Sequence, residues 1–153
     1  MPVHSFFIKT DWPGMRNDVG TLNSSTLNTN ISIPPEMDGP GIGTNPDEML
    51  LGAAATCYII TLAAMLERSN VPKASLTMES EGIVEIEKGI ISYKKIIHRP
   101  TLILSKECTE KELKTANKLV AKAEKSCMIS RAVKGNVIIE LNETVLVLDS
   151  GER

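Results

Sequence analysis

The longest apolar segment of the chain lies at residues 49–66, where eighteen consecutive positions carry no charge. Just before it, Asn45 is a residue type favoured as a helix N-cap, and Pro46 suits the first helical position. Pro72 follows and cannot continue a helix. Together these signals predict a single long helix over residues 46–69.

This segment is long enough to raise the question of a transmembrane helix. However, it contains five alanines, one glycine and two threonines, and the acidic residues Asp47 and Glu48 flank its start. A helix that is apolar on every face can also be buried on all sides of a globular core. In so small a chain, a partner subunit must supply part of that cover. We therefore expect no membrane partner, and a homodimer in which both chains cover the helix.

Period-two alternation in the N-terminal third predicts two strands, over residues 4–11 and 26–33. The segment between them, residues 12–25, is rich in Pro, Gly, Asn, Asp and Ser. It predicts a long turn or an added short strand. Residues 34–43 contain too many prolines and glycines for a helix or strand. They form a predicted loop with no phosphate-binding glycine motif.

The C-terminal half alternates strand and helix patterns. Residues 75–87 and 90–105 predict a strand pair, and a capping box that begins at Thr109 opens an amphipathic helix over 110–126. Residues 136–148 predict the last strand. The order of two strands, helix, two strands, helix and strand indicates an α+β fold with mixed or antiparallel pairing.

Composition narrows the class of protein. With 153 residues, 42% hydrophobic and 24% charged, residues 1–153 are expected to form one globular domain. A net charge of −2 and only 3% aromatic residues argue against a nucleic-acid partner. Three cysteines without metal-ligand spacing suggest no bound metal. The N-terminus lacks a secretory pattern, so we expect a cytoplasmic protein whose thiols are kept reduced.

Two thiols are the best candidates for chemistry. Cys57 lies at the centre of the apolar helix, and Cys127 follows the second helix. Buried cysteines are most often inert, and burial by itself raises a thiol pKa. Lys125 and Arg131 flank Cys127 and could lower its pKa. For Cys57 we expect a nearby cation, and Arg16, held in a turn rich in Gly, Asn and Asp, is the candidate.

Other nucleophilic sites are weakly supported. Only His4 and His98 could serve as an imidazole base, and both lie in predicted strands. His98 is interpreted as a structural residue, which disfavours a hydrolase with a Cys–His or Ser–His pair. Cys108 precedes a helix N-cap, a position that lowers a thiol pKa. Because it stands in a polar stretch, we interpret it as incidental.

Several motifs resemble the OsmC/Ohr family, named for osmotically inducible and organic hydroperoxide resistance proteins. GTNPDEML at residues 43–50 and AAATCY at 53–58 resemble the start of that family's central helix. AEKSC at residues 123–127 resembles its second cysteine motif. IPPEMDGPG at residues 33–41, with the Arg16 turn, resembles the Ohr branch in particular. The resemblance covers nearly the whole chain.

The resemblance implies an OsmC-like fold of antiparallel sheets around central helices, in an intertwined homodimer. It implies that hydroperoxide oxidises Cys57 to a sulfenic acid, which Cys127 resolves as a disulfide. Arg16 would stabilise the Cys57 thiolate and orient the peroxide. The family's helix-start glutamate, which pairs with that arginine, falls on Asp47, and neighbouring Glu48 could serve instead.

Spacing adds one constraint that is independent of the resemblance. Asp47 and Cys57 are ten residues apart on one predicted helix, which is about 15 Å along its axis. A carboxylate that far from the thiol cannot touch it within one chain. If both belong to one site, they meet across two subunits.

These observations lead to one expected function and one alternative. The first is a cytoplasmic cysteine-based peroxidase of the oxidative stress response, which reduces organic hydroperoxides without a bound cofactor. Its electrons would come from an external dithiol, which in the Ohr branch is a lipoyl group. The alternative is an OsmC-like domain with weak or no peroxidase activity that binds a small apolar ligand or a thioester at the dimer interface.

Overall fold

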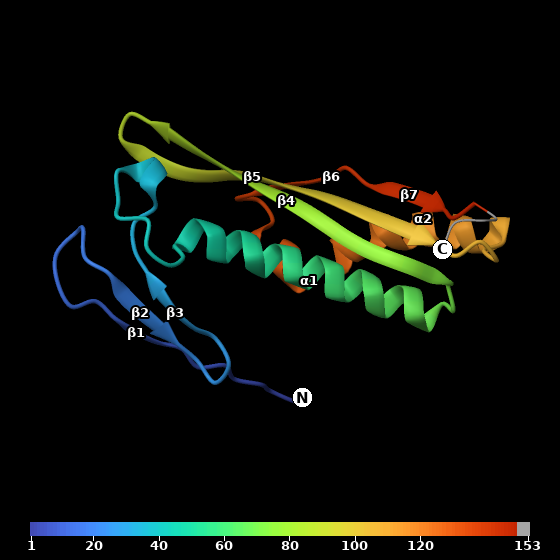
Figure 1. The fold of residues 1–153 in the computed structure, drawn as a ribbon, viewed down its shortest axis with the longest axis horizontal. Coiled ribbons are helices and arrows are strands. Elements are labelled where there is room, and N and C mark those ends of the chain that lie inside the picture. Colours follow the sequence, from blue (N-terminus) through green and yellow to red (C-terminus); the bar gives the residue numbers. More distant parts are fainter. Residues whose placement is uncertain (150–153) are drawn as a thin grey trace. The chain divides into compact units, whose positions relative to one another are not determined.

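The computed structural model describes residues 1–149 and forms two compact units, Met1–Met49 and a second that begins at Leu50 (Figure 1). The prediction of one domain over 1–153 remains a prediction, and its last four residues lie outside the described part. In chain order the elements are β1 (Lys9–Asp11), β2 (Gly20–Asn23), β3 (Asn28–Ile31), the 3-10 helix η1 (Pro35–Met37), α1 (Pro46–Arg68), β4 (Lys73–Glu87), β5 (Ile90–Leu104), α2 (Glu110–Ser126), α3 (Met128–Val133), β6 (Ile138–Leu141) and β7 (Thr144–Val147).

The first unit contains a three-stranded antiparallel sheet in the order β1-β2-β3. The predicted strands 4–11 and 26–33 are present but shorter, and the alternative of an added strand between them is confirmed by β2. The first residue of β2 is Gly20. A Cβ at this position would overlap the Asp11 carbonyl oxygen and the Trp12 ring, so the close approach requires glycine. The segment is therefore a tight meander that is held mainly by backbone hydrogen bonds between its strands, because few of its side chains are buried.

The predicted loop at 34–43 is confirmed and is closed by backbone contacts. The Ser32 hydroxyl donates to the Ile42 carbonyl oxygen and accepts from the Ile42 amide, each at 2.8 Å. Thr44 forms a parallel bridge with Ile31. Gly43 has a φ of +72°, a left-handed conformation that glycine adopts without strain. The loop thus returns the chain to the start of α1.

The second unit is built on the long antiparallel hairpin of β4 and β5, whose register pairs Ser80 with His98. The predicted last strand is present as two short strands, β6 and β7, which both pair with β5 in parallel. The Asn142 amide donates to the His98 carbonyl oxygen at the break between them. The sheet is therefore mixed, because a helical connection lets the chain return in the direction of β5.

The core of the second unit lies where α1, α2 and β5 meet. The buried residues of α1 fall at Ala54, Tyr58, Leu62, Met65 and Leu66, a spacing that forms one stripe along the helix. They pack with Leu102 and Leu104 of β5 and with Ala116, Val120 and Ala123 of α2. The capping box predicted at Thr109 is present and opens α2. This packing fixes α1 on one face of the hairpin (Figure 1).

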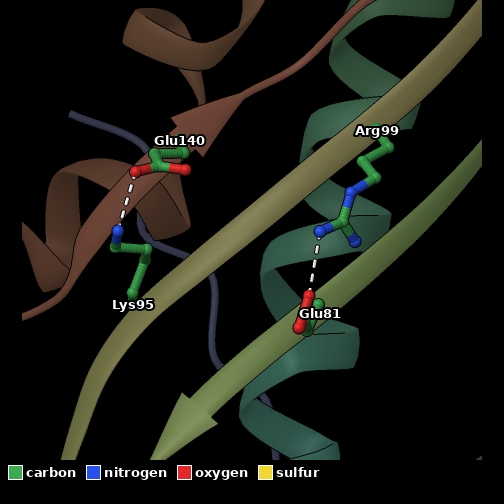
Figure 2. Close-up of polar contacts among 4 residues, drawn as sticks. All are labelled: Glu81, Lys95, Arg99 and Glu140. Atoms are coloured by element: carbon green, nitrogen blue, oxygen red, sulfur yellow. Dashed lines mark hydrogen bonds and ion pairs between the residues drawn. The ribbon is translucent and has the colours of Figure 1, made fainter.

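Two ion pairs join neighbouring strands on the opposite face of the hairpin (Figure 2). Lys95 Nζ lies 2.7 Å from Glu140 Oε1 and joins β5 to β6. The guanidinium of Arg99 lies 2.8 Å from Glu81 Oε1 and joins β5 to β4. Both pairs are partly exposed, so each stabilises the fold by no more than about 1 kcal/mol. They mark the solvent side of a sheet whose other side carries the core.

Helix α1 is the one helix among residues 1–149 that is long and apolar enough to cross a membrane. The core helix of a soluble protein passes the same test. However, the stripe described above leaves most of α1 only partly covered by this chain, and Ile60 is 67% exposed. The uncharged surface of α1 is therefore larger than the single chain can bury.

Candidate functional site

The structure brings Cys57 and Cys127 together within the second unit. Cys57 lies on α1 and is half-buried, whereas Cys127 is buried at the junction of α2 and α3. The Cys127 thiol acts on Cys57 as a hydrogen-bonding group that lowers its pKa, and both cysteines are free. Residues seventy positions apart in the chain therefore lie next to each other, and the redox pairing that the resemblance implies stays a prediction.

The surroundings of Cys57 favour its thiolate. Burial raises its pKa, but the hydrogen bond from the Cys127 thiol, the backbone N–H groups of Ile129 and Met128, and the Thr61 hydroxyl lower it, and their combined effect is the larger. The net result is a pKa below the ordinary thiol value. The causes of this shift include no cation, and our expectation that Cys57 also needs a nearby positive charge stays a prediction.

Helix α3 supplies two of these donors, and the sequence analysis missed it. After α2 ends, Cys127 adopts an extended conformation, and the chain begins a new short helix at Met128. The first amide groups of a helix have no partner within it and are free to donate to an anion. Here the amides of Met128 and Ile129 reach the Cys57 sulfur. The sequence signal was slight: six residues without proline or glycine, Met128–Val133, directly after the cysteine.

Cys127 has the opposite character. Burial and the contact with Cys57 raise its pKa, although the nearby Ser130 hydroxyl and amide favour its thiolate. The expectation that Lys125 and Arg131 lower the Cys127 pKa was therefore wrong. Cys127 is fully buried, whereas both cations stand on the exposed surface. The pair thus consists of one thiol whose pKa is lowered and one whose pKa is raised.

Cys108 takes no part in this pair. Burial and the neighbouring Glu112 carboxylate raise its pKa, so the lowering expected from its place before a helix N-cap was wrong. The Glu112 side chain is part of the same capping box that closes the helix start. Burial and this carboxylate both disfavour a thiolate at Cys108.

Behind Cys57, the next residue of α1 belongs to a buried polar cluster. The Tyr58 hydroxyl donates to the Val120 carbonyl oxygen at 2.8 Å, and its ring stacks on His98 with 5.4 Å between centroids. His98 Nδ1 lies 2.7 Å from the Ser80 hydroxyl oxygen. Burial lowers the His98 pKa, so the ring is held neutral. These contacts fit the interpretation of His98 as a structural residue, and they fix the turn of α1 that carries Cys57.

Arg16 is held rigidly inside the first unit. Its guanidinium donates to the Met37 carbonyl oxygen at 2.9 Å, to that of Asp38 at 3.4 Å and to Asn17 Oδ1 at 2.7 Å. The turn that carries Arg16 is thereby tied to the loop around η1. The predicted partnership of Arg16 with Cys57 involves both units and stays a prediction.

The acidic candidates lie in the first turn of α1. Asp47 and Glu48 precede Leu50, where the second unit begins. The predicted cap is present, because Asn45 Oδ1 accepts from the Glu48 amide at 2.9 Å. The Glu48 carboxylate accepts from the Thr44 hydroxyl at 3.0 Å. A pairing of either carboxylate with Arg16 remains a prediction.

With this geometry established, comparison with known proteins identifies the class. Residues 39–142 match the family model of OsmC-like proteins. The chain belongs to the OsmC-like family. Proteins of this family are typically dimers. The match spans both cysteines and most of the second unit. Among residues 1–149, no cluster of His, Cys, Asp or Glu side chains could hold a metal ion.

Relatives in sequence fall into two groups. The chain is 62% identical to YmaD of Bacillus subtilis, a protein named as uncharacterized, over 95% of this chain and 97% of that protein. It is 28% identical to organic hydroperoxide resistance protein-like 1 of Staphylococcus saprophyticus, over 74% of this chain and 78% of that protein. The family is therefore established, and of these two relatives it is the more distant one whose name refers to organic hydroperoxides.

Solved structures confirm the fold. An organic hydroperoxide resistance protein OsmC from Legionella pneumophila superimposes with a TM-score of 0.75 at 22% identity, covering 94% of this chain and 99% of that one. OhrB of Bacillus subtilis gives a TM-score of 0.67 at 22% identity, covering 91% and 98%. The predicted α+β, OsmC-like fold is confirmed.

Proposed function

We propose that the protein is a cysteine-based peroxidase that reduces organic hydroperoxides. The observation that carries this proposal is the contact between Cys57, whose pKa is lowered, and the buried, protonated Cys127. A thiolate is the nucleophile in peroxide reduction, and a neighbouring thiol is needed to resolve the product. Membership of a family that includes organic hydroperoxide resistance proteins supports the substrate class.

The proposed reaction proceeds in three steps. The Cys57 thiolate attacks the distal peroxide oxygen, the O–O bond breaks, and the alkoxide takes a proton and leaves as an alcohol. Cys127 then attacks the Cys57 sulfenic acid, which forms a disulfide and releases water. An external dithiol finally reduces the disulfide by thiol–disulfide exchange and is itself oxidised to a cyclic disulfide. No bound cofactor is required, and a lipoyl group is one dithiol of this class.

The apolar surroundings of Cys57 favour a peroxide with an organic substituent. Its neighbours along α1 carry no charge, and the aliphatic ones include the exposed Ile60. We propose that the protein is a cytoplasmic homodimer whose second copy covers this uncharged surface. Apolar area removed from water stabilises an interface by roughly 25 cal/mol per Å² before the cost of association. Light scattering that gives a monomer mass at micromolar concentration would contradict the homodimer.

The decisive experiment compares three cysteine variants in a peroxidase assay with an organic hydroperoxide and several dithiols. Cys57→Ser should abolish turnover. Cys127→Ser should allow one turnover and leave a sulfenic acid that dimedone traps. Cys108→Ser is the matched control, because Cys108 lies outside the pair, and it should keep full activity. Turnover that survives in Cys57→Ser would refute the proposal, and unreactive thiols in a ligand-binding protein would favour the apolar-ligand or thioester alternative.

A further inference from the structure

Next to Cys127, the second unit contains a cleft of 540 Å³ between the end of α2, α3 and the start of β6. Three cationic side chains line it, those of Lys125, Arg131 and Lys134, with Glu124 as the one carboxylate. All three cations are exposed, and within residues 1–149 none of them forms an ion pair. The cleft therefore carries an excess of positive charge that this chain does not neutralise.

A buried hydroxyl distinguishes this cleft from an ordinary basic surface. Ser130 is only 6% exposed, and apart from the neighbouring Cys127 thiol its Oγ has no hydrogen-bond partner within the described residues. A buried polar group with unused hydrogen-bonding capacity is costly, and native proteins rarely leave one unexplained. Ser130 lines the cleft and lies beside the Cys127 thiol. It is therefore a donor at the boundary between the cleft and the dithiol pair.

We propose that this cleft is an anion-binding site that holds the carboxylate of the small dithiol that reduces the Cys57–Cys127 disulfide. The role of this ligand as a reductant rests on the proposed peroxidase function. The binding of an anion rests on the cleft alone. Arg131 can offer a planar pair of donors to a carboxylate, and the two lysines add charge around it.

The cleft reaches Ser130, which lies beside the Cys127 thiol, so a dithiol bound there is close to the disulfide that we propose it reduces. The two S–H bonds of the reductant break and its sulfurs join in a ring, while the Cys57–Cys127 bond becomes two thiols. Two electrons and two protons pass from the dithiol to the protein, so the exchange needs no further reactant. A charge on the reductant raises its local concentration in the cleft, and this effect weakens as salt screens it.

The binding test uses a pair of probes without sulfur, octanoate and octanamide, which differ in charge at one end. Octanoate should shift the amide NMR signals of Ser130, Gly135 and Val137, and octanamide should not. Arg131→Gln and Lys134→Gln should each weaken octanoate binding at least fivefold. Lys111→Gln removes the same charge at the other end of α2, about 21 Å away, and should leave binding unchanged. Equal binding of the two probes, or an equal effect of Lys111→Gln, overturns the site.

The kinetic test uses dihydrolipoate and dihydrolipoamide, which carry the same dithiol but differ in charge. At low salt, kcat/KM for dihydrolipoate should exceed that for dihydrolipoamide by about tenfold, and this preference should vanish in Arg131→Gln/Lys134→Gln. Equal kcat/KM values with octanoate still bound at the cleft would overturn the reductant role. If no dithiol supports peroxide consumption, the proposed function fails, and the octanoate titration still decides whether the cleft binds anions.

Discussion

The two compact units bury their apolar side chains to very different extents. In residues 1–49, Leu22 and Pro34 are buried, whereas nine large hydrophobic side chains are exposed: Met1, Val3, Phe6, Phe7, Ile8, Trp12, Met15, Leu27 and Ile42. In the second unit, the helices α1 and α2 enclose a continuous core against β5. The first unit is held by backbone pairing and the Arg16 hydrogen bonds, and the second by packing.

This difference indicates where each unit obtains its stability. A three-stranded sheet needs a buried face to be stable on its own. The first unit lacks one within the single chain, and the uncharged surface of α1 is likewise only partly covered. In the proposed homodimer, a second copy would remove both the exposed side chains of the first unit and the uncharged surface of α1 from water.

The largest expected effect comes from the core of the second unit. Leu62→Ala should lower the free energy of unfolding by about 2–5 kcal/mol, because Leu62 is fully buried and its removal leaves a cavity. Leu27→Ala in the first unit should cost less than about 0.5 kcal/mol if the side chain remains 48% exposed. Urea titration of both variants measures the contrast. Equal costs would show that a partner buries Leu27 as deeply as the core buries Leu62.

The second prediction separates the roles of the two units in catalysis. Arg16→Lys should reduce the peroxidase rate by more than about tenfold, because an ammonium group lacks the planar fork that can hold a carboxylate and a peroxide at once. The labelling of Cys57 by iodoacetamide against pH should be unchanged, since donors in the second unit lower its pKa. Mass spectrometry reads this labelling, with Cys108 as the internal control. A shifted Cys57 curve would mean that the first unit also sets the thiol pKa.

A smaller effect is expected inside the second unit, at the residue next to Cys57. Tyr58→Phe removes the hydrogen bond to the Val120 carbonyl oxygen but keeps the ring that stacks on His98. It should lower the free energy of unfolding by about 1 kcal/mol, which is typical of one buried hydrogen bond. Chemical denaturation gives this value. A neutral result would show that packing alone fixes this turn of α1.

The smallest effect is a dependence of stability on pH. Burial lowers the His98 pKa in the folded protein from its ordinary value of 6.5. Below that value the unfolded chain binds a proton that the folded chain does not. The contribution of His98 is therefore complete above about pH 6.5 and declines as the pH falls toward the folded pKa.

The matched variant for this prediction is Ser80→Ala/His98→Phe, which removes the imidazole together with its hydroxyl partner. Between pH 8 and pH 5, Tm should fall more in the wild type than in the variant when both are measured by calorimetry. Parallel curves would show that His98 is protonated in the folded protein and contributes nothing to the pH dependence.

Local sequence determined the elements whose signals are complete within a short segment. Helix α2 was predicted at its observed bounds because a capping box and a polar–apolar period both specify it. Helix α1 and the hairpin of β4 and β5 were likewise predicted to within a few residues. The sequence also singled out Cys57 and Cys127, since their motifs resemble a known family.

Tertiary structure decided what depends on neighbours distant in the chain. The last strand is split into β6 and β7 because both pair with β5 around a break at Asn142. The lowered Cys57 pKa arises first from the Cys127 thiol and then from amides of α3, groups that the fold places against a residue seventy positions earlier. The same packing buries Cys127 away from Lys125 and Arg131, leaving both cations beside the cleft. Burial and hydrogen bonding set a thiol pKa, and both depend on tertiary contacts that the sequence alone does not specify.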